Sequence, residues 1–173
     1  MPPAHATPSH TPQALLAILD SPLNKAGRVA AVYVHTTKNA LISVNPGVRL
    51  PRTFRRFCGL MAQLLQKLSI RATNGPDKLL KVVKGPVTRL LPPDAHRVGF
   101  SRGAGAPVSV AALAGADVLP EGRPLVFVVG AFAHGAIEDA YVDARIAVSA
   151  YPLSAAYALG RITNALEARW GIV

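Results

Sequence analysis

An apolar pattern over residues 53 to 68 constrains the fold of this chain more than any other feature. Pro51 precedes the pattern, and Thr53 stands where a capping residue belongs. The apolar positions recur at the i, i+3, i+4, i+7 spacing of a helix with one buried face; they are Phe54, Phe57, Leu60, Met61, Leu64, Leu65 and Leu68. The spacing therefore predicts a half-buried helix that begins after Thr53.

Arginines gather at the beginning of this predicted helix, where unpaired backbone N–H groups already present positive potential. Arg52 and Arg56 lie four residues apart and project from one face, with Arg55 between them. Arg49 precedes them on the entering turn. Such crowding costs stability unless an anion binds there, so the pattern indicates a phosphate site. The alternative is a solvated charged end that tolerates its own repulsion.

The positive charge is concentrated in one part of the chain. Residues 25 to 102 contain fifteen Lys or Arg against two acids, whereas residues 103 to 173 contain four against six. Arginine outnumbers lysine thirteen to six, which favours planar partners such as phosphates and base edges over a diffuse membrane surface. Nucleic acid is therefore the predicted partner, although a basic chain can also be merely soluble.

Composition indicates a globular domain. A chain of 173 residues suits one domain, and 50% apolar against 16% charged residues excludes general disorder. No apolar run approaches the roughly 18 residues of a membrane span, and the first residues do not resemble a secretory signal. Cys58 has no partner for an intramolecular disulfide. We predict no metal site, because the histidines lack ligand spacing; they are His5, His10, His35, His96 and His134.

Strand and helix patterns alternate along the chain, which predicts an α/β fold. Residues 29–34 and 40–44 predict a hairpin, residues 124–130 a central strand, and residues 79–83, 97–100 and 145–150 further strands. The run ALLAILD predicts a short helix that Asp20 ends, and Pro152 is expected to open a final helix through about Arg169. Residues up to about 13 read as loose.

Two loops after predicted strands are candidates for ligand binding. Gly130 and Gly135 in VVGAFAHG would let a ligand approach the backbone, although they match neither a P-loop nor GxGxxG and can simply form a turn. The loop VSAYPLSA at 148 to 155 joins a strand to a helix. Open α/β sheets bind ligands at the carboxyl ends of their strands, so two such loops favour a pocket.

Hydrolase chemistry has little support, because no GxSxG motif occurs and carboxylates are few. Asp20 is the exception, since it lies beside Ser21 and Asn24 and away from other acids. Burial there would raise its pKa. Helix termination is the alternative role for this residue.

Long motifs give a specific resemblance. In order they are LLAILDSPLNKAG, VHTTKNALISVNPGVRLPRTFRRFCGLMAQLLQKLSIRATNGPDKLLKVVKGP, VVGAFAHG and AYPLSAA. Over residues 13 to 173 the chain resembles the pseudouridine N1-specific methyltransferases of small-subunit ribosomal RNA, which are also ribosome biogenesis factors. The motifs are closer to eukaryotic than to archaeal members.

The resemblance implies a single SPOUT-class α/β domain over residues 13–173, after a loose segment 1–12, with a C-terminal trefoil knot. It also implies a homodimer, S-adenosylmethionine as cofactor, other ribosome assembly factors as partners, and a place in the nucleus and nucleolus. Carried over by position, the RNA-binding residues are Arg49, Arg52 and Arg56. The cofactor-binding residues are Phe100, Gly130, Gly135, Ala136, Ile137, Val148, Ser149, Ala150, Tyr151, Pro152 and Leu153.

The implied reaction transfers a methyl group to N1 of a pseudouridine, which must lose its N1 proton to become nucleophilic. Asp20 matches the family aspartate that is the candidate for accepting this proton. The rest of catalysis is expected to be positioning of an unstacked nucleotide.

The chain departs from the family pattern at its start. Thr7, Pro8 and Ser9 stand where the family carries Arg-Pro-Asp, so that RNA contact is expected to be lost. The family's usual N-terminal strand and helix are also expected to be missing. Two other functions therefore stay open: a non-enzymatic RNA-binding assembly factor, and a related SPOUT enzyme that acts on ribose or another base.

Overall fold

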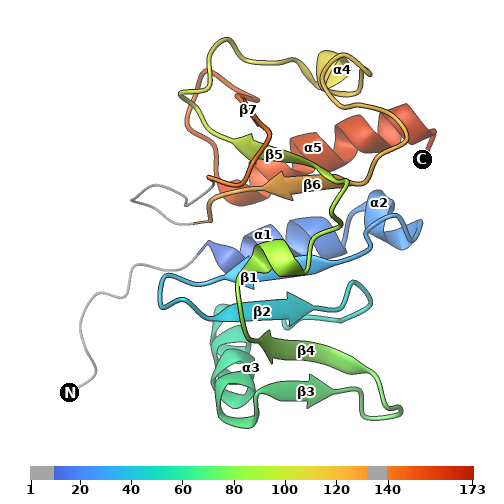
Figure 1. Ribbon diagram of the computed structural model, residues 1–173. Coiled ribbons are helices and arrows are strands. Elements are labelled where there is room, and N and C mark those ends of the chain that lie inside the picture. The colour runs from blue at the N-terminus through green and yellow to red at the C-terminus, as the bar shows by residue number, and fades with distance from the viewer. Residues whose placement is uncertain (1–9, 132–139) are drawn as a thin grey trace.

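The computed structural model describes residues 10–131 and 140–173, which form two sheets with flanking helices (Figure 1). One sheet is antiparallel in the order β1-β2-β4-β3, from Val32–His35, Leu41–Val44, Lys78–Val83 and Ser69–Arg71. The other is parallel in the order β6-β5-β7, from Leu125–Val128, His96–Phe100 and Ala144–Ile146. The helices are α1 Thr11–Leu19, α2 Pro22–Lys25, α3 Phe54–Lys67, α4 Val110–Leu113 and α5 Ala155–Trp170, and the 3-10 turn η1 is Val87–Arg89.

The predicted hairpin is confirmed as the antiparallel pair β1 and β2, in which Val32 faces Val44. Two hydrogen bonds between Thr36 and Ala40 close the turn. The Thr36 N–H donates to the Ala40 carbonyl at 2.9 Å, and the Thr36 hydroxyl accepts from the Ala40 N–H at 3.0 Å. Asn39 supplies the left-handed backbone that this turn needs, with φ of 60°.

The predicted α/β character is confirmed, but the prediction that residues 124–130 form a central strand is wrong. β6 pairs only with β5 among the described strands, and β5 takes the centre of the parallel sheet between β6 and β7. Its four residues are accordingly half-buried rather than buried. An apolar run alone does not distinguish an edge strand from a central one.

Helix α3 begins at Phe54 and ends at Lys67, close to the predicted bounds. Phe57 and Leu64 are buried in the core beneath the antiparallel sheet. Phe54, Leu65 and Leu68 are instead exposed, by 49%, 56% and 56%, so the prediction that all the apolar positions share the buried face is wrong for these three. The helix covers β3 and β4 over a narrower face than its apolar pattern spans.

Helix α3 has no side-chain cap at its amino end and no loop after its carboxyl end. Thr53 occupies the N-cap position with extended backbone, but its side chain makes no cap hydrogen bond. Leu68 ends the helix in the left-handed conformation, with φ of 59°, and β3 begins at the next residue. The helix is thus joined directly to the sheet.

Two apolar cores lie on either side of the helix pair α1 and α5. The first lies under the antiparallel sheet and includes Leu15, Leu19, Val44, Leu64 and Leu80. The second surrounds the parallel sheet and includes Leu23, Val98, Leu113, Leu119, Ile162 and Leu166. Val29 packs against both cores, and α1 runs alongside α5 (Figure 1), so the chain folds as one connected unit.

Helix α5 begins at Ala155 rather than at Pro152, because Ser154 caps it by accepting from the Tyr157 N–H at 3.2 Å. At its other end Trp170 lies 4.5 Å beneath the Arg28 guanidinium carbon, in cation–π contact. In the described residues no helix has both the length and the apolar character to cross a bilayer.

Candidate active site

Asp20 lies at the end of α1, in a turn that its neighbours hold rigidly. The Ser21 hydroxyl donates to the Ile18 carbonyl at 2.6 Å and accepts from the Asn24 N–H at 3.1 Å, which starts α2. Asp20 itself is exposed, so the burial expected for its carboxyl group is wrong. The turn therefore presents the carboxylate to solvent.

Arg52 forms a two-pronged ion pair with this carboxylate, across 32 residues of sequence. Its two terminal nitrogens lie 2.9 Å from Asp20 Oδ2 and 3.2 Å from Oδ1. Both side chains stay accessible, with 73% of Arg52 and 45% of Asp20 exposed. The structure thus places the predicted proton acceptor against one predicted RNA-binding residue, Arg52, and the other two, Arg49 and Arg56, are also exposed.

Asn24 fixes the Asp20 turn relative to the segment that carries the arginines. Its side-chain amide donates to the Leu19 carbonyl at 3.0 Å and to the Pro46 carbonyl at 2.9 Å. Leu19 immediately precedes Asp20, and Pro46 lies three residues before Arg49. The sequence marked Asn24 only as a neighbour of Asp20, because nothing in its local pattern points to a partner 22 residues away.

The predicted cofactor residues meet at the carboxyl edge of the parallel sheet. Phe100 ends β5, Gly130 follows β6, and the loop from Val148 to Leu153 follows β7. The three strands run in the same direction, so these segments emerge together. The Phe100 ring packs against Phe127, with ring centroids 5.8 Å apart. Gly135, Ala136 and Ile137 lie outside the described residues, as do Thr7, Pro8 and Ser9.

The loop after β7 offers both apolar and backbone contacts. Val148 is buried and Leu153 half-buried, while Ala150, Tyr151 and Pro152 are exposed. The Ser149 hydroxyl accepts from the Tyr151 N–H at 2.9 Å and holds a tight turn. Half-buried apolar surface beside main-chain donors and acceptors suits a nucleoside such as the adenosyl group.

Within one chain, the arginine cluster and the cofactor edge lie at opposite ends of α5. The Leu23 N–H, next to the Asp20 turn, donates to Glu167 Oε1 at 3.0 Å near the end of the helix. The predicted cofactor loop precedes Ser154 at the beginning, and Ser154 and Glu167 are separated by thirteen positions, a rise of about 20 Å. Asp20 and the predicted cofactor loop of the same chain therefore lie near opposite ends of α5.

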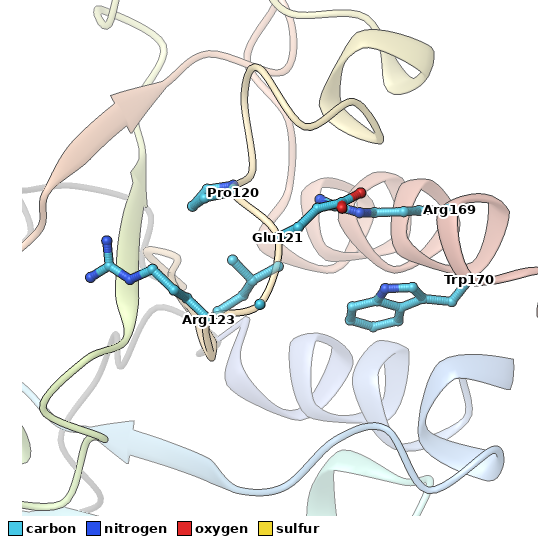
Figure 2. A pocket seen from close by; sticks show the side chains of 7 residues that line it. Pro120, Glu121, Arg123, Arg169 and Trp170 are labelled. Carbon is cyan, nitrogen blue, oxygen red and sulfur yellow. The ribbon is translucent and has the colours of Figure 1, made fainter.

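A pocket of about 200 Å³ lies at the amino end of β6, at the opposite edge of the sheet from the predicted cofactor loops. Figure 2 shows Arg169 and Trp170 of α5 facing the segment that carries Pro120, Glu121 and Arg123. The Arg169 side chain already has partners within the chain, because it donates to the Leu119 carbonyl at 2.7 Å and lies 3.5 Å from the Glu121 carboxylate. The pocket is not part of the predicted site.

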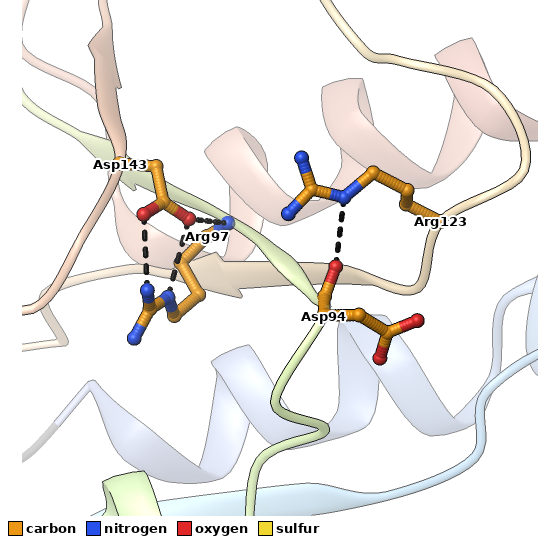
Figure 3. Close-up of polar contacts among 4 residues, drawn as sticks. All are labelled: Asp94, Arg97, Arg123 and Asp143. Atoms are coloured by element: carbon orange, nitrogen blue, oxygen red, sulfur yellow. Dashed lines mark hydrogen bonds and ion pairs between the residues drawn. The ribbon is translucent and has the colours of Figure 1, made fainter.

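Polar contacts fix the register of the parallel sheet (Figure 3). Arg97 reaches both carboxylate oxygens of Asp143, at 3.0 Å and 3.2 Å, and its backbone N–H also donates to that carboxylate at 2.8 Å. The side-chain hydrogen bond from Arg97 is the main cause that lowers the pKa of Asp143 below its ordinary value. Arg123 donates to the Asp94 carbonyl at 2.8 Å and ties the start of β6 to β5.

Within residues 10–131 and 140–173, no group of three or more His, Cys, Asp or Glu side chains is placed to hold a metal ion.

Comparison with known proteins gives consistent matches. The human ribosomal RNA small subunit methyltransferase NEP1 is 50% identical over 99% of this chain, which covers 68% of the human protein. The Schizosaccharomyces pombe ribosomal RNA small subunit methyltransferase mra1 is 49% identical over 98% of this chain and 47% of its own length. The chain thus spans about two thirds of the human relative.

A solved structure and a family model agree with these relatives. Archaeoglobus fulgidus Nep1 bound to S-adenosylhomocysteine superposes with a TM-score of 0.74 at 26% identity, over 93% of this chain and 70% of that one. The model of the EMG1/NEP1 methyltransferase family matches residues 8–167. The chain shares its mixed α/β fold with that structure, and it belongs to the EMG1/NEP1 methyltransferase family.

Proposed function

We propose that this chain methylates N1 of a pseudouridine in small-subunit ribosomal RNA, with S-adenosylmethionine as the methyl donor, and acts in small-subunit biogenesis. The observation that carries the proposal is an exposed carboxylate, Asp20, held among exposed arginines in a member of this methyltransferase family. The human and fission yeast relatives are named ribosomal RNA small subunit methyltransferases, which supports the same substrate class.

The arginines would hold the RNA backbone. Arg49, Arg52 and Arg56 are exposed around the start of α3, and the helix end is not capped by the Thr53 side chain. Guanidinium groups and helix amides both bind phosphate oxygens, and such contacts position a nucleic acid without reading its sequence. The target base would then be presented unstacked to the site.

Asp20 would accept the proton from N1 of the pseudouridine. The nitrogen can take a methyl group only as its proton leaves, and an exposed carboxylate beside the bound backbone can receive it. When bound, S-adenosylmethionine supplies a sulfonium methyl group and leaves as S-adenosylhomocysteine. Phe100, Gly130 and the loop 148–153 would hold it by apolar and main-chain contacts, together with Gly135, Ala136 and Ile137 as the resemblance implies.

A homodimer would complete the site. Asp20 and the cofactor loop of one chain lie at opposite ends of α5, so the carboxylate of one subunit would serve the cofactor loop of its partner. The trefoil knot implied by the resemblance would form among the loops that follow β6 and β7. Both features belong to this proposal, as does a place in the nucleus and nucleolus.

A methylation assay on an RNA hairpin with a single pseudouridine tests the proposed reaction. We expect one methyl group per hairpin at N1 in the wild type, loss of product in Asp20→Asn, and no product on the same hairpin with uridine. Uridine lacks the N1 proton, because its N1 carries the ribose. Product on the uridine hairpin would point instead to a SPOUT enzyme that acts on ribose or another base.

RNA binding without catalysis is the second candidate function, because the arginine cluster does not depend on the cofactor loop for its geometry. Hairpin binding with no methylated product, and no thermal shift with saturating S-adenosylmethionine, would favour the assembly factor. In either case Arg56→Ala should lower the slope of log affinity against log salt by about one counterion, and should leave cofactor affinity unchanged.

A further inference from the structure

The ion pair between Asp20 and Arg52 engages the candidate proton acceptor in the RNA-free chain. Both carboxylate oxygens face one guanidinium, at 2.9 Å and 3.2 Å, in the fork geometry that arginine forms with carboxylates. With both oxygens engaged by Arg52, the carboxylate is not open to the N1–H of a base. The same Arg52 is a predicted phosphate contact.

A phosphate group is well placed to take Arg52 away from Asp20. The pair is accessible to solvent on both sides, with 73% and 45% of the two side chains exposed, and exposed ion pairs are weak. Asp20 is also the sole acid in the first 76 residues, which contain nine Lys or Arg. The surrounding positive charge therefore attracts a polyanion to this place.

We propose that Arg52 is a substrate-operated latch on Asp20: it pairs with the carboxylate in the free protein, and an RNA phosphate draws it away and leaves Asp20 open to the base. The proposal rests on the proposed function, since it assumes that RNA binds at α3. Asn24 keeps the geometry fixed, because it ties Leu19 to Pro46 and thereby holds the Asp20 turn against the arginine segment. Arg52 alone then needs to move.

The latch predicts competition between Asp20 and RNA for one side chain. Removing the carboxylate's charge in Asp20→Asn should tighten binding of the pseudouridine hairpin by about two- to fivefold, the range expected for an exposed ion pair. This gain should disappear when Arg52 is also replaced, in Asp20→Asn with Arg52→Gln. Both positions are exposed on a surface that Asn24 and the core hold, so the variants retain the folded core.

The matched control replaces Arg56 instead of Arg52. Arg56 is exposed in the first turn of α3, but Arg52 is the residue that pairs with Asp20, so in an Arg56→Gln background Asp20→Asn should still tighten binding by the same factor. Affinities are measured by fluorescence anisotropy with a labelled hairpin at fixed salt, in all six proteins. The cycle with Arg52 should show coupling, and the cycle with Arg56 should show none.

The possible outcomes distinguish failure of the latch from failure of the proposed RNA-binding function. An equal gain in the presence and absence of Arg52 would mean that Asp20→Asn acts only through general charge, and would overturn the latch. Absence of any gain in the wild-type background would also overturn it. Failure of the wild type to bind the hairpin would overturn the RNA-binding function itself, and with it the latch.

Discussion

At the scale of single residues, the site depends on side chains that join distant segments. Asn24 contributes no charge and no chemistry, yet its amide connects the end of α1 to the turn before Arg49. Its two hydrogen bonds satisfy two backbone carbonyls of separate segments. A residue of this kind determines whether Asp20 and Arg52 meet at all.

Asn24→Ala should therefore destabilise the chain by about 1–3 kcal/mol, because it leaves two partly buried carbonyls without their donor. Urea unfolding measures the change. Asn164→Ala is the control, since Asn164 is exposed on α5 and its replacement should alter stability by less than about 0.5 kcal/mol. Equal effects of the two variants would contradict the bridging role of Asn24.

Asp143 gives the chain a pH dependence of known sign. Hydrogen bonds from Arg97 lower its pKa in the folded protein, so its contribution to stability is full above the unfolded pKa and is lost as pH falls through the folded pKa. Asp143→Asn should reduce the loss of stability between about pH 5 and pH 3, measured as urea midpoints. Asp77→Asn, at an exposed acid in another part of the chain, should leave that loss unchanged.

At the scale of elements, α3 shows what an apolar period predicts about a helix and what it does not. Its apolar positions predict the helix and both its ends to within a residue, but the pattern spans a wider arc than the sheet covers. Leu64 is fully buried against the sheet, whereas its neighbour Leu65 is 56% exposed. Periodicity reports which positions are apolar, and only packing decides which of them are covered.

These adjacent leucines form a matched test of that packing. Leu64→Ala should cost about 2–5 kcal/mol, because it opens a cavity in the first core. Leu65→Ala changes the same residue type in the same helix turn and should cost less than about 0.5 kcal/mol. Thermal unfolding of the two variants checks this difference, and a similar loss in both would mean that α3 packs otherwise.

The sequence predicted the hairpin and α3 because each has a strong local pattern, and it predicted β5 from the weaker pattern of residues 97–100. It missed β3, since three residues with a shifted register beside β4 are too short to carry a period. It missed α2 and α4 for the same reason, as each has four residues. The predicted RNA-binding arginines and Asp20 do lie together, but the sequence could not show that the cofactor loop lies at the far end of α5.

At the scale of the whole molecule, the two parts of the proposed site are separated by one helix. The arginine cluster lies at the end of α5 where Glu167 meets Leu23, and the cofactor loop lies at the end where Ser154 caps the helix. The chain as described has both parts of the proposed chemistry and does not bring them together. A second copy is the simplest way to unite them.

Mixing two inactive variants tests this arrangement. Asp20→Asn would remove the proton acceptor and Leu153→Arg would block the cofactor loop, so each variant alone should show no methylation. A mixed dimer pairs the intact Asp20 of one chain with the intact loop of the other, and the mixture should recover about a quarter of wild-type activity by random pairing. Continued inactivity of a mixture shown to contain mixed dimers would rule out a site shared between subunits.

The junction between α3 and β3 has a consequence for recognition. Leu68 turns the chain in a single residue, and the Val82 N–H of β4 donates to its carbonyl at 2.9 Å. Because no loop separates α3 from β3, the helix cannot rotate unless β3 and β4 move with it. On the proposed function, the backbone that carries the guanidinium groups would meet RNA as a stiff template, and the spacing of the RNA phosphates, more than their number, would decide which RNA is accommodated.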